Sequence, residues 1–188
     1  QKVYGQEGSL IVFADFAGRI APYLSELNRG RNLTLIISQQ ERQAAARRLR
    51  RIGKAADQLV IGINPGATFG TAKRWPADRF IALSRKFIEQ EKALVLIFGG
   101  PGEAELGQSI ALQTGPKCVN LCNETTLRQA MALIASCHAF VTNDSGLMHV
   151  AAALDIPQVA IIGPTDPVAT GPVNAASTMV QVADICDQ

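Results

Sequence analysis

The sequence has no apolar run near the roughly 18–20 residues that a membrane-spanning helix requires. It also opens without a secretory signal peptide, because QKVYGQEG contains neither a basic segment nor an apolar one. Since the first residue is Gln rather than Met, we expect a truncated or processed chain. Hydrophobic residues make up 47% and charged residues 18%, which is typical of a globular domain, alone or with a fragment of another.

Patterns for disulfides and metal ions are also missing. The chain has four cysteines and two histidines, namely Cys118, Cys122, Cys137, Cys186, His138 and His149. No cysteine pair has CxxC spacing, and the histidines fit no usual zinc pattern. Cys118 and Cys122 fall on one short predicted strand, which suits neither a disulfide nor a metal site. We therefore expect buried, reduced thiols, a cytoplasmic location, and no metal or cofactor.

Charge is distributed unevenly along the chain. Residues 1–57 contain ten Lys/Arg and five Asp/Glu, whereas the remaining residues contain eight and eleven. The basic excess centres on ARRLRRIGK, residues 46–54. A basic helical face is most often only solvated, and attraction to an anionic membrane or an acidic partner is the alternative. No RNA- or DNA-binding motif accompanies it, so no nucleic-acid partner is expected.

From residue 59 onward, predicted strands alternate with predicted helices. Five apolar runs predict strands, at 59–67, 93–100, 118–122, 139–143 and 157–164. Four segments predict helices, at 77–90, 102–115, 125–137 and 145–155. This alternation predicts βαβ units in a parallel sheet, and the uninterrupted apolar strands indicate helices on both faces. The fold class is therefore α/β, over residues 58–188.

Residues 1–57 do not continue this alternation. Ser38 and Glu41 have the S-x-x-E spacing of a capping box, which predicts a helix that starts after Ser38 and runs to about Gly53. GSLIVFADFAGRIAPYLSEL (8–27) is predicted to be helical or mixed. We interpret residues 1–57 as the remnant of a preceding domain with a connecting helix.

Polar and glycine-rich segments follow four of the predicted strands. They are NPGATFGTAKRW (64–75), GGPGE (99–103), NDSG (143–146) and GPTDP (163–167). In open α/β sheets, ligands bind beyond the carboxyl ends of the strands. Because these four segments should converge on that one edge, they predict a ligand site there.

Two of these segments favour phosphate. Glycines let the NPGATFG backbone approach a phosphate closely, and Lys73 offers a positive charge, although an exposed surface loop is the alternative. Asp144, Ser145 and Gly146 begin a helix whose free N–H groups and positive dipole end favour an anion. Asp144 or Ser145 could instead simply cap that helix, and both roles can hold at once.

Two other side chains, His149 and Glu103, each have two possible roles. His149 lies one helical turn after Ser145 and is either a satisfied core residue or a ligand contact. Glu103 opens a helix, where a carboxylate is favourable in any case, and it could also accept hydrogen bonds from sugar hydroxyls. The absence of a G-x-S-x-G elbow, a Walker A sequence and a G-x-G-x-x-G turn argues against triad hydrolases, P-loop NTPases and dinucleotide enzymes.

INPGATFGTAKRWPADRF, LIFGGPGEAE and VNLCNETTLRQAMALIASCHAFVTNDSGLMHVAAALDIPQVAIIGPTDP together resemble the lipopolysaccharide heptosyltransferases of glycosyltransferase family 9. The resemblance covers about residues 31–172, and KRWP and TNDSGLMHVAAAL are its most specific parts. It implies the GT-B architecture, two Rossmann-like domains with a cleft between them, of which this chain is mostly the C-terminal, donor-binding one.

The implied reaction is an inverting, metal-independent transfer of heptose from ADP-L-glycero-D-manno-heptose. The acceptor would be Kdo or heptose of the lipid A–core oligosaccharide, at the cytoplasmic face of the inner membrane, where peripheral membrane contact is expected. The N-terminal domain would supply the acceptor site and an aspartate general base. Since that domain is almost wholly absent, the chain alone is expected to bind donor weakly and not to transfer heptose.

Site roles also follow from the resemblance. Lys73 would bind the diphosphate with help from Thr68, Glu103 would contact the adenosine ribose or the sugar, and Asp144 would bind heptose hydroxyls. The backbone of Ser145 and Gly146 would hold phosphate, and His149 would support this loop from behind.

Some features depart from the family, and alternatives stay open. The segment VNAAS (173–177) has no confident match. A non-catalytic nucleotide-sugar-binding module, a GT-B enzyme with another donor, and a nucleotide-sugar epimerase are the other hypotheses. Whether the acceptor is of the heptosyltransferase I or II kind is open.

Overall fold

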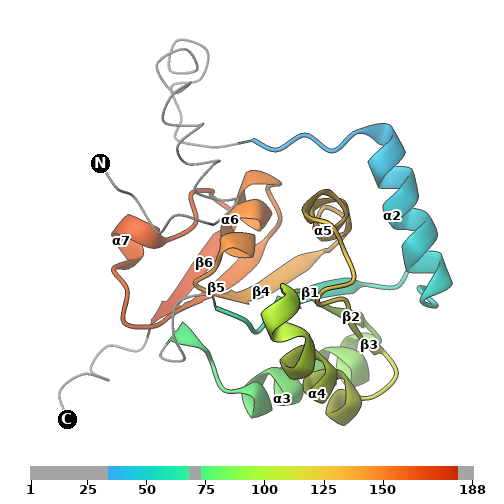
Figure 1. Cartoon of the computed structure of the whole chain (residues 1–188), viewed down its shortest axis with the longest axis horizontal. Helices are drawn as coiled ribbons and strands as arrows, with labels where there is room; N and C mark the ends of the chain where they lie inside the picture. The colour runs from blue at the N-terminus through green and yellow to red at the C-terminus, as the bar shows by residue number, and fades with distance from the viewer. Residues whose placement is uncertain (1–33, 68–72, 182–188) are drawn as a thin grey trace.

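A single parallel sheet organises the part of the chain that the computed structural model describes, residues 34–67 and 73–181. Its six strands lie in the order β3-β2-β1-β4-β5-β6, and every neighbouring pair is parallel (Figure 1). The strands are β1 (Val60–Asn64), β2 (Leu94–Ile97), β3 (Cys118–Asn120), β4 (Ala139–Asn143), β5 (Gln158–Ile162) and β6 (Ser177–Gln181). The chain winds outward from β1 in both directions, so the strand order reverses between β1 and β4.

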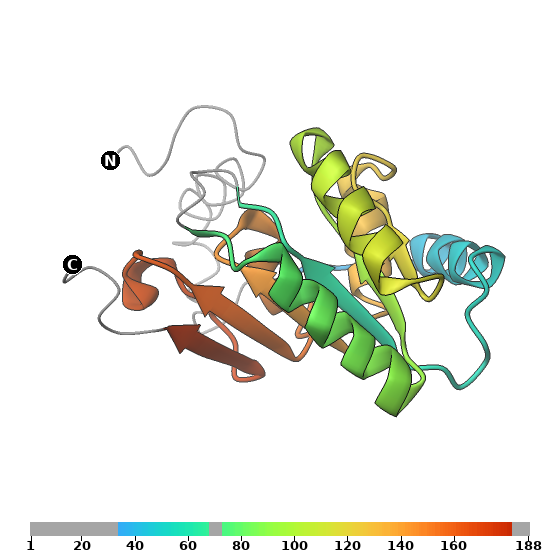
Figure 2. The same cartoon turned by 90° about the horizontal axis from the view of Figure 1, so that it is seen from below.

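Helices cover both faces of this sheet. They are α2 (Gln39–Arg51), α3 (Ala77–Glu91), α4 (Ala104–Thr114), α5 (Leu127–Ile134), α6 (Gly146–Ala153) and α7 (Pro167–Thr170), with a 3-10 turn η2 (Pro101–Glu103). Helices α3 and α4 lie on one face, and α2, α5 and α6 lie on the other (Figures 1 and 2). Side chains alternate accordingly, because Val60 packs with α5 while Ile61 and Ile63 pack with α3 and α4. The predicted α/β class is confirmed.

The five predicted strands and the four predicted helices are present, with shorter ends. Two details were wrong: Cys122 lies in the loop after β3, and Glu103 ends the η2 turn instead of lying inside an α-helix. The sixth strand, β6, was not predicted. Its sequence STMVQ is half polar and mostly exposed at the sheet edge, so it lacks the apolar run that marks the inner strands. Pairing with β5 defines it instead.

Helix α2 packs into the same core as the sheet. The predicted capping box is confirmed, because the Ser38 hydroxyl accepts from the Glu41 N–H and the Glu41 carboxylate accepts from the Ser38 N–H. Ala45 and Leu49 are buried in the cluster that contains α5. Across that contact, Arg128 donates to both carboxylate oxygens of Glu41, at 2.7 Å and 2.6 Å. The domain boundary between residues 57 and 58 stays a prediction, although α2 is part of this core.

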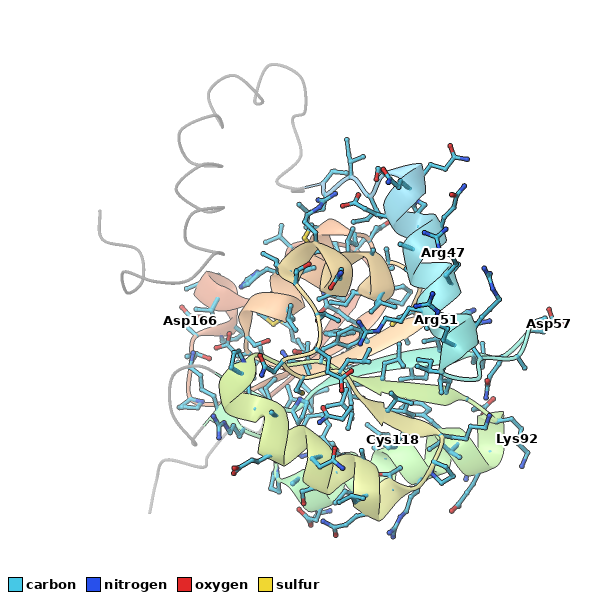
Figure 3. The ribbon with its side chains drawn as sticks, turned by 45° about the vertical axis from the view of Figure 1, so that its right-hand side comes forward. Arg47, Arg51, Asp57, Lys92, Cys118 and Asp166 are labelled. Carbon is cyan, nitrogen blue, oxygen red and sulfur yellow. The ribbon has the colours of Figure 1, made fainter. Side chains whose placement is uncertain are left out.

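The basic segment of α2 faces solvent. Arg47 and Arg51 lie on the helix surface (Figure 3), and Arg48 pairs with Glu124 at 2.9 Å. The basic segment is therefore exposed, and both interpretations of it stay predictions. In the described ranges, no helix combines the length and apolar character needed to cross a bilayer.

The described cysteines are buried and unbridged, as predicted. Cys118, Cys122 and Cys137 are free thiols inside the domain. Burial raises the pKa of Cys118 to about 11 and that of Cys122 to about 12, so both stay protonated near neutral pH. Cys186 lies outside the described residues.

The Glu41–Arg128 pair should make stability depend on acid pH. Hydrogen bonds from Arg128 and Ser38 lower the pKa of Glu41 from 4.5 to about 2. A lowered folded-state pKa contributes stability above the unfolded value, and this contribution is lost as pH falls from about 4.5 toward 2. We expect the urea midpoint to fall more between pH 6 and pH 3 in wild type than in Glu41→Gln, which retains the capping-box geometry.

The control is Glu91→Gln, at the exposed end of α3, for which the structure describes no ion-pair partner. It should keep the wild-type pH dependence. An equal fall of the midpoint in wild type and Glu41→Gln would contradict the assignment.

Candidate functional site

Two asparagines end the central strands at the point where the strand order reverses. The Asn64 amide, at the end of β1, donates to the Ser145 hydroxyl at 2.6 Å and accepts from the Gly66 N–H at 3.3 Å. The Asn143 amide, at the end of β4, donates to the Pro65 carbonyl at 2.8 Å. Both asparagines are buried. They fasten the β1 and β4 loops to each other, at the edge where open α/β sheets bind ligands.

Sequence reasoning missed both asparagines. Asn64 lies at the start of the predicted loop NPGATFGTAKRW, and Asn143 lies at the start of NDSG. A signal was present, because each is a single amide directly after a run of apolar strand residues. Such a residue is buried with its strand and must find hydrogen-bond partners.

The N-terminus of α6 lies beside these asparagines. Ser145 occupies the N-cap position, but its side chain makes no capping hydrogen bond. Its hydroxyl accepts from Asn64 instead. The hypothesis that Ser145 or Asp144 caps the helix with its side chain was therefore wrong. Ser145 gives the first turn of this eight-residue helix no side-chain cap, and the positive end of a helix dipole favours an anion.

Lys73 and Asp144 form an ion pair at this position. Lys73 Nζ lies 2.8 Å from Asp144 Oδ2, and the Asp144 side chain is only 8% exposed. The Thr165 hydroxyl donates to the same carboxylate oxygen at 2.7 Å. The structure thus brings together residues from the β1, β4 and β5 loops. Thr165 belongs to the predicted GPTDP segment but had not been singled out.

His149 lies one turn into α6 and is half-buried. Burial lowers the pKa of His149 below 6.5, and the nearby Asp144 charge opposes that shift. The imidazole is therefore mainly neutral at pH 7. No hydrogen bond to His149 is found among the described residues, and both the core role and the ligand-contact role stay predictions.

Glu103 reaches across from the end of β2 to the β1 loop. Its carboxylate accepts from the Gly100 N–H. It also lies so close to Gly66 and Gly99 that a Cβ at Gly66 would overlap it. Two glycines therefore make the room that Glu103 occupies, and the carboxylate lies beside the loop that carries Lys73.

The predicted residues fall into three groups. The first group lies at the ends of β1 and β4 and consists of Lys73, Asp144, Ser145 and Gly146. Glu103 lies against Gly66 of the β1 loop. His149 lies one helical turn further along α6. Thr68 lies outside the described residues. Figure 3 shows that Asp166, the N-cap of α7, lies at the opposite side of the domain from Asp57 and Lys92. In residues 34–67 and 73–181, no three His, Cys, Asp or Glu side chains form a metal-binding group.

The link between Asp144 and His149 can be measured directly. Asp144→Asn removes the charge that favours the imidazolium, so the pKa of His149 should fall further, as followed by NMR titration of its ring protons. Asp155→Asn is the control, because it removes a carboxylate at the far end of the same helix. A His149 pKa that stays constant or rises in Asp144→Asn would contradict the link.

Comparison with known proteins identifies the family of the chain. The family model described as glycosyltransferase family 9 (heptosyltransferase) matches residues 23–188. The lipopolysaccharide heptosyltransferase 2 of Salmonella typhimurium is 45% identical over 132 residues, which cover 68% of this chain and 38% of that protein. The lipopolysaccharide heptosyltransferase 1 of Pseudomonas aeruginosa is 32% identical over 106 residues, which cover 56% and 29%.

The fold is similar as well. The structure of the E. coli ADP-heptose lipopolysaccharide heptosyltransferase II superposes with a TM-score of 0.72 at 38% identity, covering 80% of this chain and 46% of that one. The chain thus spans about two fifths of the length of the Salmonella relative and less than half of the E. coli one. Because the family model matches most of its length, the chain belongs to glycosyltransferase family 9.

Proposed function

We propose that this chain is the donor-binding part of a lipopolysaccharide heptosyltransferase. The reaction would transfer heptose from ADP-L-glycero-D-manno-heptose to the inner-core Kdo or heptose of lipid A–core, with inversion and without a metal ion. The observation that carries the proposal is the Lys73–Asp144 pair at 2.8 Å beside the uncapped N-terminus of α6. A cation and free N–H groups suit a diphosphate, and a carboxylate suits sugar hydroxyls.

The donor and the acceptor type draw support from the relatives. The E. coli structure is described as an ADP-heptose enzyme. Identity is 45% to a type 2 heptosyltransferase and 32% to a type 1 enzyme, which favours a type 2 acceptor for this chain. Transfer itself would need the preceding domain, which supplies the acceptor site and the general base. Residues 1–57 would be its remnant, and 58–188 the donor domain.

Departure of the diphosphate during sugar transfer explains why a lysine and backbone N–H groups would be needed at this site. When the sugar leaves, negative charge develops on the diphosphate, and donors that are already in place stabilise it most effectively. Lys73 would bind the diphosphate with Thr68, and the Ser145 and Gly146 backbone would hold a phosphate at the helix N-terminus. Asp144 holds the Lys73 ammonium near the α6 N-terminus. On binding, the flexible lysine stem lets Nζ shift toward phosphate oxygens.

The remaining residues would act at the nucleotide and the loop. Glu103 would accept hydrogen bonds from the ribose or the sugar, because its carboxylate faces the β1 loop with one oxygen bound to Gly100. His149 would support the α6 loop as a neutral side chain. The enzyme would work at the cytoplasmic face of the inner membrane, with peripheral membrane contact as part of the proposal.

A calorimetric titration tests the donor class. ADP-heptose and ADP should bind the chain more tightly than UDP does. Binding of UDP as tight as that of ADP would contradict the heptosyltransferase assignment and favour an enzyme or a binding module for another nucleotide sugar.

The role of Lys73 in ADP binding can be measured separately from its effect on the stability of the domain. Lys73→Met keeps the stem and removes the charge, so ADP affinity should fall about tenfold to a hundredfold, and less so in high salt. Lys86→Met, on the exposed surface of α3, is the control. Thermal melting checks the fold, because the variant leaves Asp144 without its cation. Unchanged ADP affinity in Lys73→Met would remove Lys73 from the site.

The space between Gly66 and Glu103 gives a further test. In Gly66→Ala the new methyl displaces the Glu103 carboxylate, so ADP should lose several-fold more affinity than inorganic diphosphate does. Gly102→Ala is the matched control, since a Cβ there meets nothing within 4 Å. Equal losses for ADP and diphosphate would place Glu103 away from the nucleoside.

A further inference from the structure

The loop between β5 and α7 reaches the site through one side chain. The Thr165 hydroxyl donates to Asp144 Oδ2 at 2.7 Å. This loop is itself held by β6, because the Gln181 amide donates to the Gly163 carbonyl at 2.9 Å and to the Thr165 carbonyl at 3.1 Å. An edge strand that sequence patterning does not reveal therefore fixes the position of Thr165.

The two oxygens of Asp144 are placed differently. Oδ2 receives both Lys73 Nζ and the Thr165 hydroxyl, at 2.8 Å and 2.7 Å. No donor to Oδ1 is found within residues 34–67 and 73–181. The side chain is nevertheless almost fully buried. One oxygen is thus anchored from two directions, and among the described residues the other has no donor.

Lys73 and Thr165 differ in how firmly they hold the Asp144 carboxylate. Lysine has a long, flexible stem and a charge that a bound diphosphate attracts, so its contact to Asp144 changes when ligand arrives. Threonine is β-branched and stiff at χ1, and its hydroxyl carries no net charge that would draw it away toward a diphosphate. The terminal torsion of aspartate is broad, so the carboxylate needs a fixed partner to keep one orientation. Among the described residues, Thr165 is the partner that meets this need once Lys73 turns toward phosphate.

We propose that Thr165 is a positioning residue that orients the Asp144 carboxylate so that Oδ1 receives a hydroxyl of the donor sugar. This inference rests on the proposed function and adds to it a specificity-determining residue. It predicts that Thr165 affects recognition of the sugar and leaves recognition of the nucleotide unchanged.

The test compares ADP with ADP-heptose by calorimetry, for the 188-residue chain and three variants. Thr165→Val keeps the shape and removes the hydroxyl, and Thr165→Ser restores a hydroxyl. Thr170→Val removes a threonine hydroxyl that donates to the Asp166 carbonyl in the same segment, away from Asp144. We expect the preference for ADP-heptose over ADP to fall about tenfold in Thr165→Val, with ADP affinity changed less than twofold.

Thr165→Ser should recover most of the preference, and Thr170→Val should keep it fully. ADP binding serves as the check of folding for each variant. A wild-type preference that survives in Thr165→Val overturns the inference and leaves the proposed function standing. A parallel loss of ADP binding in Thr165→Val also overturns it, because the role would then be structural. A wild-type chain without a preference for ADP-heptose over ADP overturns the inference too. Failure of the proposed function is distinct, since UDP would then bind the wild-type chain as tightly as ADP does.

Discussion

The hydrogen bond between the Asn64 amide and the Ser145 hydroxyl, at 2.6 Å, joins the two loops on which the site is built. It forms because β1 and β4 are parallel neighbours, with Asn64 in register with Thr142. The bond engages the serine side chain that would otherwise cap α6. The same contact therefore joins the two loops and leaves α6 without a side-chain cap from Ser145. Under the proposed function, such a helix N-terminus favours the phosphate of the donor.

Charge at the site is balanced before any ligand arrives. Lys73 and Asp144 are both largely shielded from water, and either one alone would be costly to bury. Their pairing keeps a cation and a carboxylate at the same place without an exposed excess of either sign. A nucleotide sugar carries both a negative diphosphate and neutral hydroxyls, so it can engage each member of the pair. The ion pair explains why residues expected to bind different parts of the donor touch each other here.

Most of the fold could be predicted from the sequence, because the inner strands are continuous apolar runs separated by amphipathic helices. The β6 edge strand could not, since only pairing with β5 defines it. At the site, strand-end position identified the loops of Lys73, Glu103 and Asp144. The contact of Lys73 with Asp144 could not be predicted, because the two residues lie 71 positions apart and their distance depends on how both loops settle. The contact of Thr165 with Asp144 could not be predicted either, because it also joins two separate loops.

The parts that sequence patterning missed form one connected support. Gln181 on β6 holds the β5–α7 loop, this loop presents Thr165, and Thr165 holds Asp144. Each step is a hydrogen bond between segments that are distant in sequence, so none leaves a local periodic signal. An outer strand with an unremarkable sequence can thus determine the orientation of a carboxylate at the centre of the sheet. In this domain the apolar pattern of the strands determines where the candidate site lies, and long-range polar contacts determine how its side chains are oriented.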